Sequence, residues 1–129
     1  MATINTGISS DSNFLNLREI ALTDVKEGVL QLLAPGEELV SAYKTIRDQV
    51  LFTTRRIFVI NVQGVTGKKT SYLSYPYSKI QYYGIETAGL LDIDSELRVT
   101  FCDGNELRFD FRSRVDIKRI SALISKYIL

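Results

Sequence analysis

The 129-residue chain has no histidine and no tryptophan, and its single cysteine is Cys102. Without histidine there can be no Ser-His or Cys-His nucleophile pair and no histidine-ligated zinc. One cysteine cannot form an intrachain disulfide or a multi-cysteine metal site. We therefore expect a protein that is not an enzyme and that has no metal or other cofactor.

Long apolar runs and an excess of either charge are also missing. No window approaches the roughly 18 apolar residues of a membrane span, and the start, MATINTGISSDSN, lacks the basic and apolar parts of a signal peptide. Sixteen basic and fifteen acidic residues give a formal net charge of +1, which argues against a dedicated nucleic-acid-binding protein. We expect a single folding unit located in the cytoplasm.

The most apolar part of the sequence is residues 49–62. It contains two runs, residues 50–52 and 57–60, separated by Thr53-Thr54-Arg55-Arg56. β-branched and aromatic residues dominate both runs, which is typical of strands. Because neither run alternates cleanly with polar residues, both strand faces should be covered. One face would belong to a sheet core, and the other would pack against N-terminal helices or a neighbouring subunit.

The segments on either side differ in periodicity. Apolar residues at helical spacing over residues 13–33 predict two short helices or one broken helix, which ends at Ala34-Pro35-Gly36. Residues 113–129 predict an amphipathic helix, and residues 113–116 resemble a capping box. Further strands are predicted at residues 38–46, 71–75, 79–87, 96–102 and 106–112. We divide the chain into an arm with a helical extension, residues 1–36, and a β domain, residues 37–129.

The last two predicted strands alternate apolar and polar residues, so their pairing can be predicted. Residues directly opposite each other in an antiparallel pair share a face. A three-residue loop, Asp103-Gly104-Asn105, matches apolar with apolar and acidic with basic side chains. The predicted pairs are Phe101 with Leu107, Val99 with Phe109, Leu97 with Phe111, Arg98 with Asp110 and Glu96 with Arg112.

Basic residues form the first candidate site. Four of them lie in or near the first and third hairpin connections, which a meander places at one end: Lys44, Arg47, Lys68 and Lys69. Four cations there would suit a phosphate headgroup or an anionic membrane surface. The alternative is a solvated loop end, and the neighbouring Asp48 and Asp103 favour this interpretation.

Three further groups of polar residues have interpretations simpler than a binding site. Arg55 and Arg56 suit an acidic partner, but their position in a hairpin turn favours a role in turn geometry. Asp92 and Asp94 lack further ligands or a positioned base nearby, so loop solvation explains them better than cation binding. Cys102 is interpreted as a small, half-buried strand residue.

Tyrosines form the second candidate site, and they are dense between residues 72 and 83. Tyrosine suits interfaces because its ring is apolar while its hydroxyl can still reach water. Strand alternation sends Tyr82 and Tyr83 to opposite faces, so one should point outward, although sheet packing explains the cluster equally well. The predicted interface residues are Phe52, Phe58, Ile60, Tyr72, Tyr82 and Tyr83.

Three stretches, LFTTRRIFV at residues 51–59, YPYSKI at 75–80 and ETAG at 86–89, resemble the bacterial pleckstrin-homology family. The resemblance spans roughly residues 10–129. It implies seven antiparallel strands in two near-orthogonal sheets, a partly open barrel capped by a C-terminal helix, and ring-like homo-oligomers. Unlike eukaryotic pleckstrin-homology domains, this chain has a short first hairpin loop and no tryptophan in the last helix.

These observations lead to one functional hypothesis and one alternative. The hypothesis is a non-enzymatic scaffold that acts by homo-oligomerisation and by contact with other proteins. The alternative is a binder of anionic lipid or a phosphorylated ligand through the four basic residues. Nucleic acid is not an expected partner.

Overall fold

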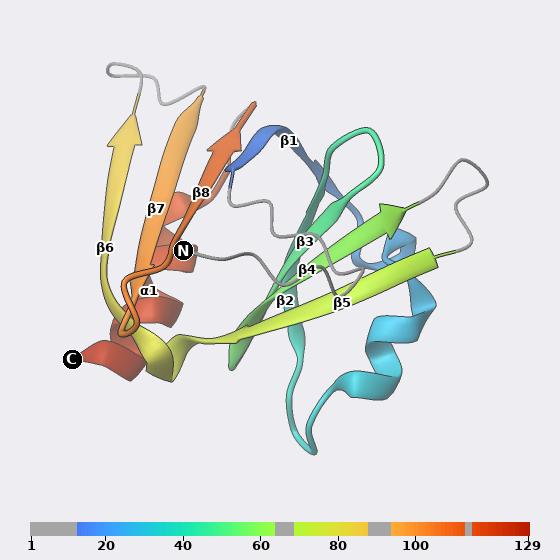
Figure 1. The fold of residues 1–129 in the computed structure, drawn as a ribbon, viewed down its shortest axis with the longest axis horizontal. Coiled ribbons are helices and arrows are strands. Elements are labelled where there is room, and N and C mark those ends of the chain that lie inside the picture. Colours follow the sequence, from blue (N-terminus) through green and yellow to red (C-terminus); the bar gives the residue numbers. More distant parts are fainter. Residues whose placement is uncertain (1–12, 64–68, 88–93, 113–114) are drawn as a thin grey trace.

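The computed structural model describes residues 13–63, 69–87, 94–112 and 115–129. Within these ranges the chain forms eight strands, one α-helix and short 3₁₀ turns (Figure 1). The strands are β1 (Asn13–Ile20), β2 (Leu39–Lys44), β3 (Gln49–Thr53), β4 (Arg56–Gln63), β5 (Lys69–Pro76), β6 (Ile80–Thr87), β7 (Ser95–Phe101) and β8 (Glu106–Phe111). The helices are η1 (Leu22–Asp24), η2 (Glu27–Leu32), η3 (Tyr77–Lys79) and α1 (Ile117–Ile128).

The strands follow the spatial order β5-β4-β3-β2-β1-β8-β7-β6. In Figure 1 the β2–β5 layer crosses the direction of the β6–β8 layer, and α1 lies behind β6–β8. The strands β5 and β6 are the two ends of the order and do not pair with each other. This arrangement confirms the predicted partly open barrel with a C-terminal helix.

Residues 13–20 form a strand, β1, in addition to the seven predicted strands, so the helix predicted there was wrong. The strand pairs antiparallel with β2 and parallel with β8, and so joins the two layers. Its register against β8 shifts between Phe14 and Leu17, where Asn16 takes a left-handed φ of 59°. This bulge turns Phe14 and Leu17 into the same core, where both are buried. Their three-residue spacing, which suggested a helix, therefore arises from a bulged strand.

The segment between β1 and β2 forms short 3₁₀ turns and not the regular helices that the spacing predicted. Val25, between η1 and η2, and Val29 of η2 pack on the outer face of the β2–β4 strands. They cover Leu51, Phe58 and Ile60, which are all buried. The second dry face of the β3–β4 hairpin is thus covered by the same chain.

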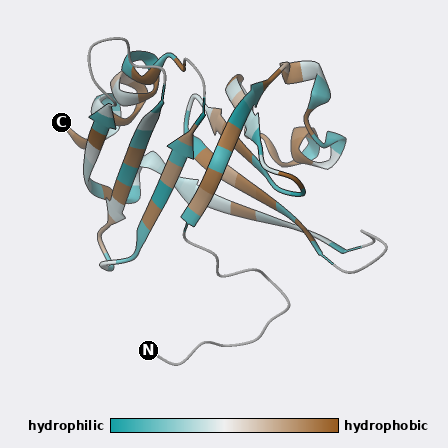
Figure 2. Cartoon of the chain, turned by 90° about the horizontal axis from the view of Figure 1, so that it is seen from above, coloured by the Kyte–Doolittle hydropathy of each residue, from teal (hydrophilic) through white to brown (hydrophobic). Residues whose placement is uncertain are grey.

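The main core lies between the two layers and α1. Phe52 and Tyr43 from one layer contact Phe111 from the other, with ring centroids 6.4 and 4.8 Å away from that of Phe111. The predicted C-terminal helix is confirmed, and it buries Ile120 and Ile124. Figure 2 shows apolar and polar bands alternating along several strands, as expected where only one strand face is buried.

The start of α1 differs from the expected capping box. Asp116 is the residue that caps the helix, because its carboxylate accepts a hydrogen bond of 3.2 Å from the Arg119 N–H. Ser113, the predicted first residue of the box, lies outside the described residues. The helix therefore begins at Ile117.

The predicted pairing of β7 with β8 was wrong by two residues. The loop does contain three residues, but they are Cys102, Asp103 and Gly104, and the Phe101 N–H donates to the Asn105 carbonyl at 2.8 Å. Gly104 takes the left-handed position, with φ at 89°, because glycine adopts it without steric cost. A two-residue shift keeps each side chain on its face, so the apolar face was predicted correctly.

The actual register places two arginines opposite each other. Arg98 pairs with Arg108, Leu97 with Phe109 and Val99 with Leu107. Glu96 lies between the two arginines, with its Oε1 3.1 Å from Arg98 Nε and 2.8 Å from Arg108 Nε. One shared carboxylate thus offsets the repulsion between the two facing arginines.

Candidate functional site

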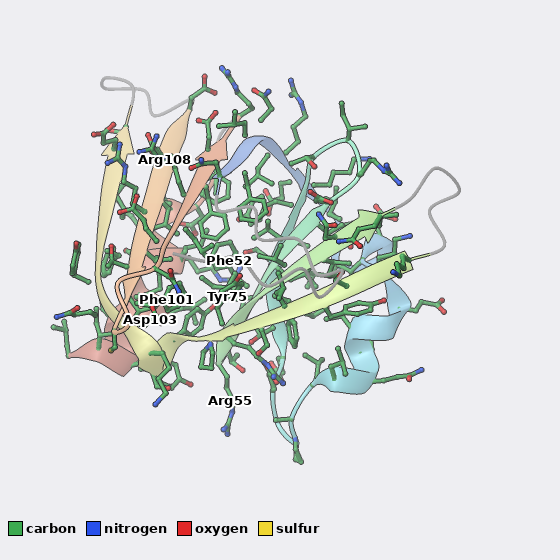
Figure 3. The ribbon with its side chains drawn as sticks, in the orientation of Figure 1. Phe52, Arg55, Tyr75, Phe101, Asp103 and Arg108 are labelled. Carbon is green, nitrogen blue, oxygen red and sulfur yellow. The ribbon has the colours of Figure 1, made fainter. Side chains whose placement is uncertain are left out.

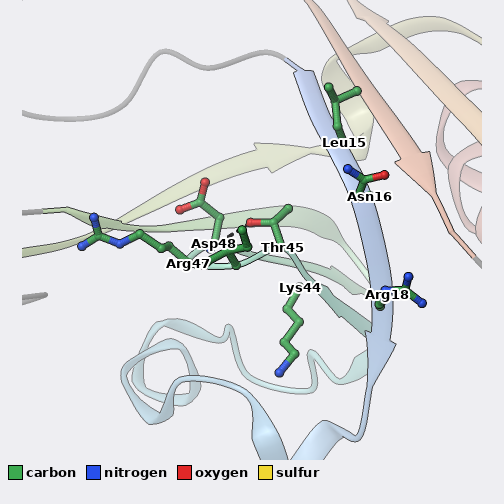
Figure 4. A pocket seen from close by; sticks show the side chains of 8 residues that line it. Leu15, Asn16, Arg18, Lys44, Thr45, Arg47 and Asp48 are labelled. Carbon is green, nitrogen blue, oxygen red and sulfur yellow. Dashed lines mark hydrogen bonds between the residues drawn. The ribbon is translucent and has the colours of Figure 1, made fainter.

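Two of the predicted basic residues line a recess of about 810 Å³ between β1 and the β2–β3 hairpin (Figure 4). Lys44 and Arg47 are exposed there, and Arg18 of β1 lies directly across from Lys44. Lys69 is exposed at the start of β5 but does not line this recess, and Lys68 lies outside the described residues. The full lining is Leu15, Asn16, Arg18, Lys44, Thr45, Ile46, Arg47 and Asp48.

Arg18 was missed because its segment was assigned to a helix outside the barrel. The pairing of β1 with β2, which no local pattern indicated, places Arg18 opposite Lys44 at the base of the hairpin loop. Ile46 at the hairpin tip is fully exposed beside these cations. The turn itself is held by Asp48, whose carboxylate accepts from Asn61 Nδ2 at 2.9 Å and whose N–H donates to Thr45 Oγ1 at 3.1 Å.

Three of the predicted interface residues are buried within their own chain. Phe52 belongs to the main core between the layers. Phe58 and Ile60 lie under η2, on the opposite face of the β2–β4 strands. The guanidinium of Arg56 also covers the Phe58 ring, with a distance of 4.5 Å from Cζ to the ring centroid. None of the three side chains is on the surface.

The three predicted interface tyrosines have different environments. Tyr82 is 59% exposed, whereas Tyr83 points to the opposite face and packs against the core, as the alternation predicted. The Tyr83 hydroxyl lies 2.7 Å from Ser125 Oγ on α1. Tyr72 is half-buried and packs beside η2, where a Cβ on Gly28 would lie 2.3 Å from its hydroxyl oxygen. Tyr82 is thus the most exposed of the three.

The strand that carries Tyr82 has an unpaired edge. β6 pairs with β7 alone, has eight residues and contains one charged residue, Glu86. The other end of the sheet, β5, begins at Lys69 and ends at Pro76, which has no N–H to donate. Long edge strands with few charges readily pair with another strand, and lysine and proline discourage such pairing. The β6 edge is therefore the better candidate for contact with another chain.

Arg56 has a structural partner in Glu37, which precedes β2. Arg56 Nη2 lies 2.7 Å from Glu37 Oε1, and its Nε donates to Oε2 at 2.9 Å. Burial alone would raise the pKa of Glu37, but hydrogen bonds from Arg56, Thr53 and the Ala34 N–H outweigh it and hold that pKa below its ordinary value. Because Arg56 also donates to the Leu32 carbonyl at 2.7 Å, it ties the end of η2 to the hairpin.

The other polar residues considered as sites are Asp92, Asp94 and Cys102. Within residues 13–63, 69–87, 94–112 and 115–129, no three metal-binding side chains come together. In the same ranges, no helix is both long and apolar enough to cross a membrane. Asp92 lies outside the described residues, and Asp94 contacts Arg112 at 3.5 Å. Cys102 is exposed in the hairpin loop, so its interpretation as a half-buried strand residue was wrong.

Comparison with known proteins agrees with this architecture. The bacterial PH domain family model matches residues 9–128. The uncharacterized protein YjqA of Bacillus subtilis strain 168 is 39% identical over 92 residues, which cover 71% of this chain and 73% of YjqA. The uncharacterized protein YozO of the same strain is 29% identical over 106 residues, which cover 82% of this chain and 90% of YozO.

Solved structures show the same fold. A DUF1696 family protein with a pleckstrin-homology domain from Shewanella loihica PV-4 superposes with a TM-score of 0.72 at 34% identity, over 89% of this chain and 99% of that chain. A pleckstrin homology domain from Shewanella amazonensis SB2B gives a TM-score of 0.56 at 38% identity, over 82% and 90% of the two chains. With its fold and nearly its whole length matched, this chain belongs to the bacterial pleckstrin-homology domain family.

Proposed function

We propose that this chain is a non-enzymatic binding module that acts by self-association and protein contact through the β6 edge. The observation that carries the proposal is an eight-residue edge strand that pairs on one side only and is exposed along most of its length. An edge strand presents a row of backbone N–H and C=O groups that another strand can satisfy.

The side chains of β6 would strengthen such a contact. Tyr82 and Ile85 project from opposite faces of the strand, and both are exposed. A strand added at this edge would therefore cover apolar surface on both faces. Pairing of two β6 edges gives a twofold dimer, whereas pairing of β6 with β5 of the next copy gives a ring when the rotation closes.

Solution mass tests this proposal. Light scattering across a range of concentrations should give a multiple of the 14.6 kDa chain mass. Replacing Tyr82 and Ile85 together by lysine should yield the monomer, because a charge on each face discourages strand addition. Leu30→Lys is the matched control, since Leu30 is an exposed leucine on η2 and away from β6. A wild-type chain that stays monomeric throughout would contradict the proposal.

The second candidate is binding of anionic lipid or a phosphorylated ligand by basic residues. It is favoured by the recess where Arg18, Lys44 and Arg47 meet the exposed Ile46. Cations beside an aliphatic tip suit an anionic surface, since the charges attract it and the tip can enter the interface. The prediction from the sequence also included Lys68 and Lys69, but Lys69 does not line this recess and Lys68 lies outside the described residues.

Co-sedimentation with phosphatidylserine-containing vesicles tests this second candidate. Binding should exceed that to phosphatidylcholine vesicles, fall with salt, and decrease when Arg18 and Lys44 become alanine. The Lys68→Ala, Lys69→Ala double variant tests the loop lysines separately. Binding that is absent, or unchanged in both double variants, would end the idea.

A further inference from the structure

Two recesses adjoin at the end of the barrel where β5 passes into η3, and Pro76 lines both. We call the first the aromatic recess; it measures about 290 Å³ and is lined by Ser74, Tyr75, Pro76, Lys79, Phe101, Cys102, Asp103 and Asn105. We call the second the arginine recess; it also measures about 290 Å³ and is lined by Ala34, Glu37, Arg55, Arg56, Pro76, Ser78 and Tyr127. Neither includes a residue of β6 or of the recess that Arg18, Lys44 and Arg47 line.

The aromatic recess has an apolar floor. The rings of Tyr75 and Phe101 lie together there, with centroids 5.3 Å apart (Figure 3). Phe101 is buried, and burial raises the pKa of Tyr75. A volume of about 290 Å³ is at the lower end of the range for small-molecule sites, which is roughly 300–1,000 Å³. The recess is therefore sized for one bulky side chain.

The arginine recess carries one uncompensated cation. Arg56 is neutralised by Glu37, as described above. Arg55 is exposed, and its labelled side chain extends away from the barrel in Figure 3. Its backbone is held on both sides, because its N–H donates to Thr53 Oγ1 at 3.0 Å and its carbonyl accepts from the Tyr77 N–H at 3.1 Å. The turn therefore presents Arg55 from a fixed position.

The charges around the two recesses favour an acidic ligand. Lys79 is exposed on the aromatic recess, and in the part of the chain that the structure describes neither Lys79 nor Arg55 has an ion-pair partner. The acidic residue on the same recess, Asp103, already accepts hydrogen bonds from the Asn105 N–H at 3.0 Å and from Asn105 Nδ2 at 2.8 Å. The two cations are thus available to a ligand, while the acidic group is engaged.

We propose that the two recesses form one docking groove for an extended, acidic peptide segment of another protein. The segment places one bulky apolar side chain on Tyr75 and Phe101, and its carboxylates meet Arg55 and Lys79. A peptide fits better than a small molecule because the two recesses are separate sites joined at Pro76, and an extended chain can occupy both. This groove is distinct from the β6 edge, so it adds a partner-binding surface to the proposed function.

A peptide array with the purified full chain tests the groove. Each probe peptide carries Phe, Leu or Trp at a varied spacing from a Glu-Asp pair. Each probe has two control spots. In one, Ala replaces the apolar residue, and in the other, Lys-Lys replaces the acidic pair. The chain should bind the apolar-acidic spots above both control spots. Equal binding to the Ala spots or to the Lys-Lys spots, or no binding at all, would overturn the proposal.

Charge reversal tests the two cations. Changing Arg55 and Lys79 to Glu should weaken binding to the apolar-acidic peptides about tenfold and move the preference toward the Lys-Lys spots. Both side chains are exposed, so the fold should be kept, which circular dichroism verifies. Lys118→Glu is the control, because Lys118 is exposed on α1 and lines neither recess. Unchanged binding after reversal would contradict the proposal.

Cys102 allows a test of the groove that requires no substitution of a buried residue. Cys102 is exposed and lines the aromatic recess. Alkylation with N-benzylmaleimide should fill this recess and abolish peptide binding, whereas the treated Cys102→Ser protein should still bind. In the reverse experiment, the tightest-binding peptide should slow alkylation of Cys102, followed by mass spectrometry. Full binding by the alkylated chain would overturn the proposal.

Discussion

The two layers of the barrel differ in how many of their faces are covered. In β3 and β4 the buried residues form unbroken runs, 50–53 and 57–61, because α1 and the β6–β8 layer cover one face and Val25 and η2 cover the other. In β7 and β8 buried and partly exposed residues alternate along most of each strand, because the second face meets solvent. The difference shows that the pattern of apolar residues along a strand reflects whether one or both of its faces are buried.

The largest expected effect comes from removing a ring on either face of the doubly covered hairpin. Phe52→Ala, in the main core, and Phe58→Ala, under η2, should each lower the free energy of unfolding by about 3–5 kcal/mol, because each leaves a cavity in a packed interior. Urea unfolding of the two variants measures this. A much smaller loss for Phe58→Ala would mean that the η1–η2 cover packs loosely.

The next effect concerns the ion pair that ties this cover to the hairpin. Glu37→Gln should cost about 2 kcal/mol, because it removes the charge that Arg56 contacts through two atoms. Since the pKa of Glu37 is lower in the folded chain than its ordinary value, its stabilising contribution is present above that ordinary value. It is lost as the pH falls through the folded pKa.

Unfolding midpoints measured against pH check this sign. The difference between the wild-type chain and Glu37→Gln should be full at neutral pH and should shrink on acidification. A difference that grows as the pH falls would contradict the interpretation.

A smaller effect tests the close contact between η2 and β5. Gly28→Ala places a Cβ 2.3 Å from the Tyr72 hydroxyl oxygen, so the ring must move, and we expect a loss of about 1 kcal/mol. Tyr72→Phe, made in the Gly28→Ala background, should recover part of this loss because the hydroxyl is gone. Thermal unfolding of the two single variants and the double variant gives the coupling.

The smallest effect is expected on the solvent face of the β6–β8 layer. Arg98→Ala should leave the urea unfolding midpoint nearly unchanged, because the Arg98 side chain is partly exposed and Glu96 keeps its second partner, Arg108. Urea unfolding measures the change. A loss comparable to that of Phe58→Ala would show that this face is covered and would remove the contrast between the layers.

Much of the barrel was predictable because its signals are local. Seven of the eight described strands, β2 to β8, and the helix α1 follow from β-rich runs, alternation and helical spacing. The three-residue loop between β7 and β8 was also predicted, but its position was not. The predicted and the observed register keep the same residues on each face, and in the observed one Gly104 takes the left-handed conformation.

The candidate sites were less predictable because they combine residues distant in sequence. Arg18 joins Lys44 through the pairing of β1 with β2. The two recesses at Pro76 combine the β3–β4 turn, the β7–β8 loop and the end of α1. Phe58 and Ile60 looked like interface residues because their cover is made of short turns with no strong pattern of their own.

By itself, the sequence determined that residues 49–62 form a hairpin with two dry faces, because periodicity reports burial wherever the backbone conformation is regular. Only the tertiary structure decided what covers the second face. Val25 and Val29 pack on Leu51, Phe58 and Ile60, in the segment that follows the pairing of β1 with β2. That placement depends on non-local strand pairing, which leaves no periodic signal in the chain.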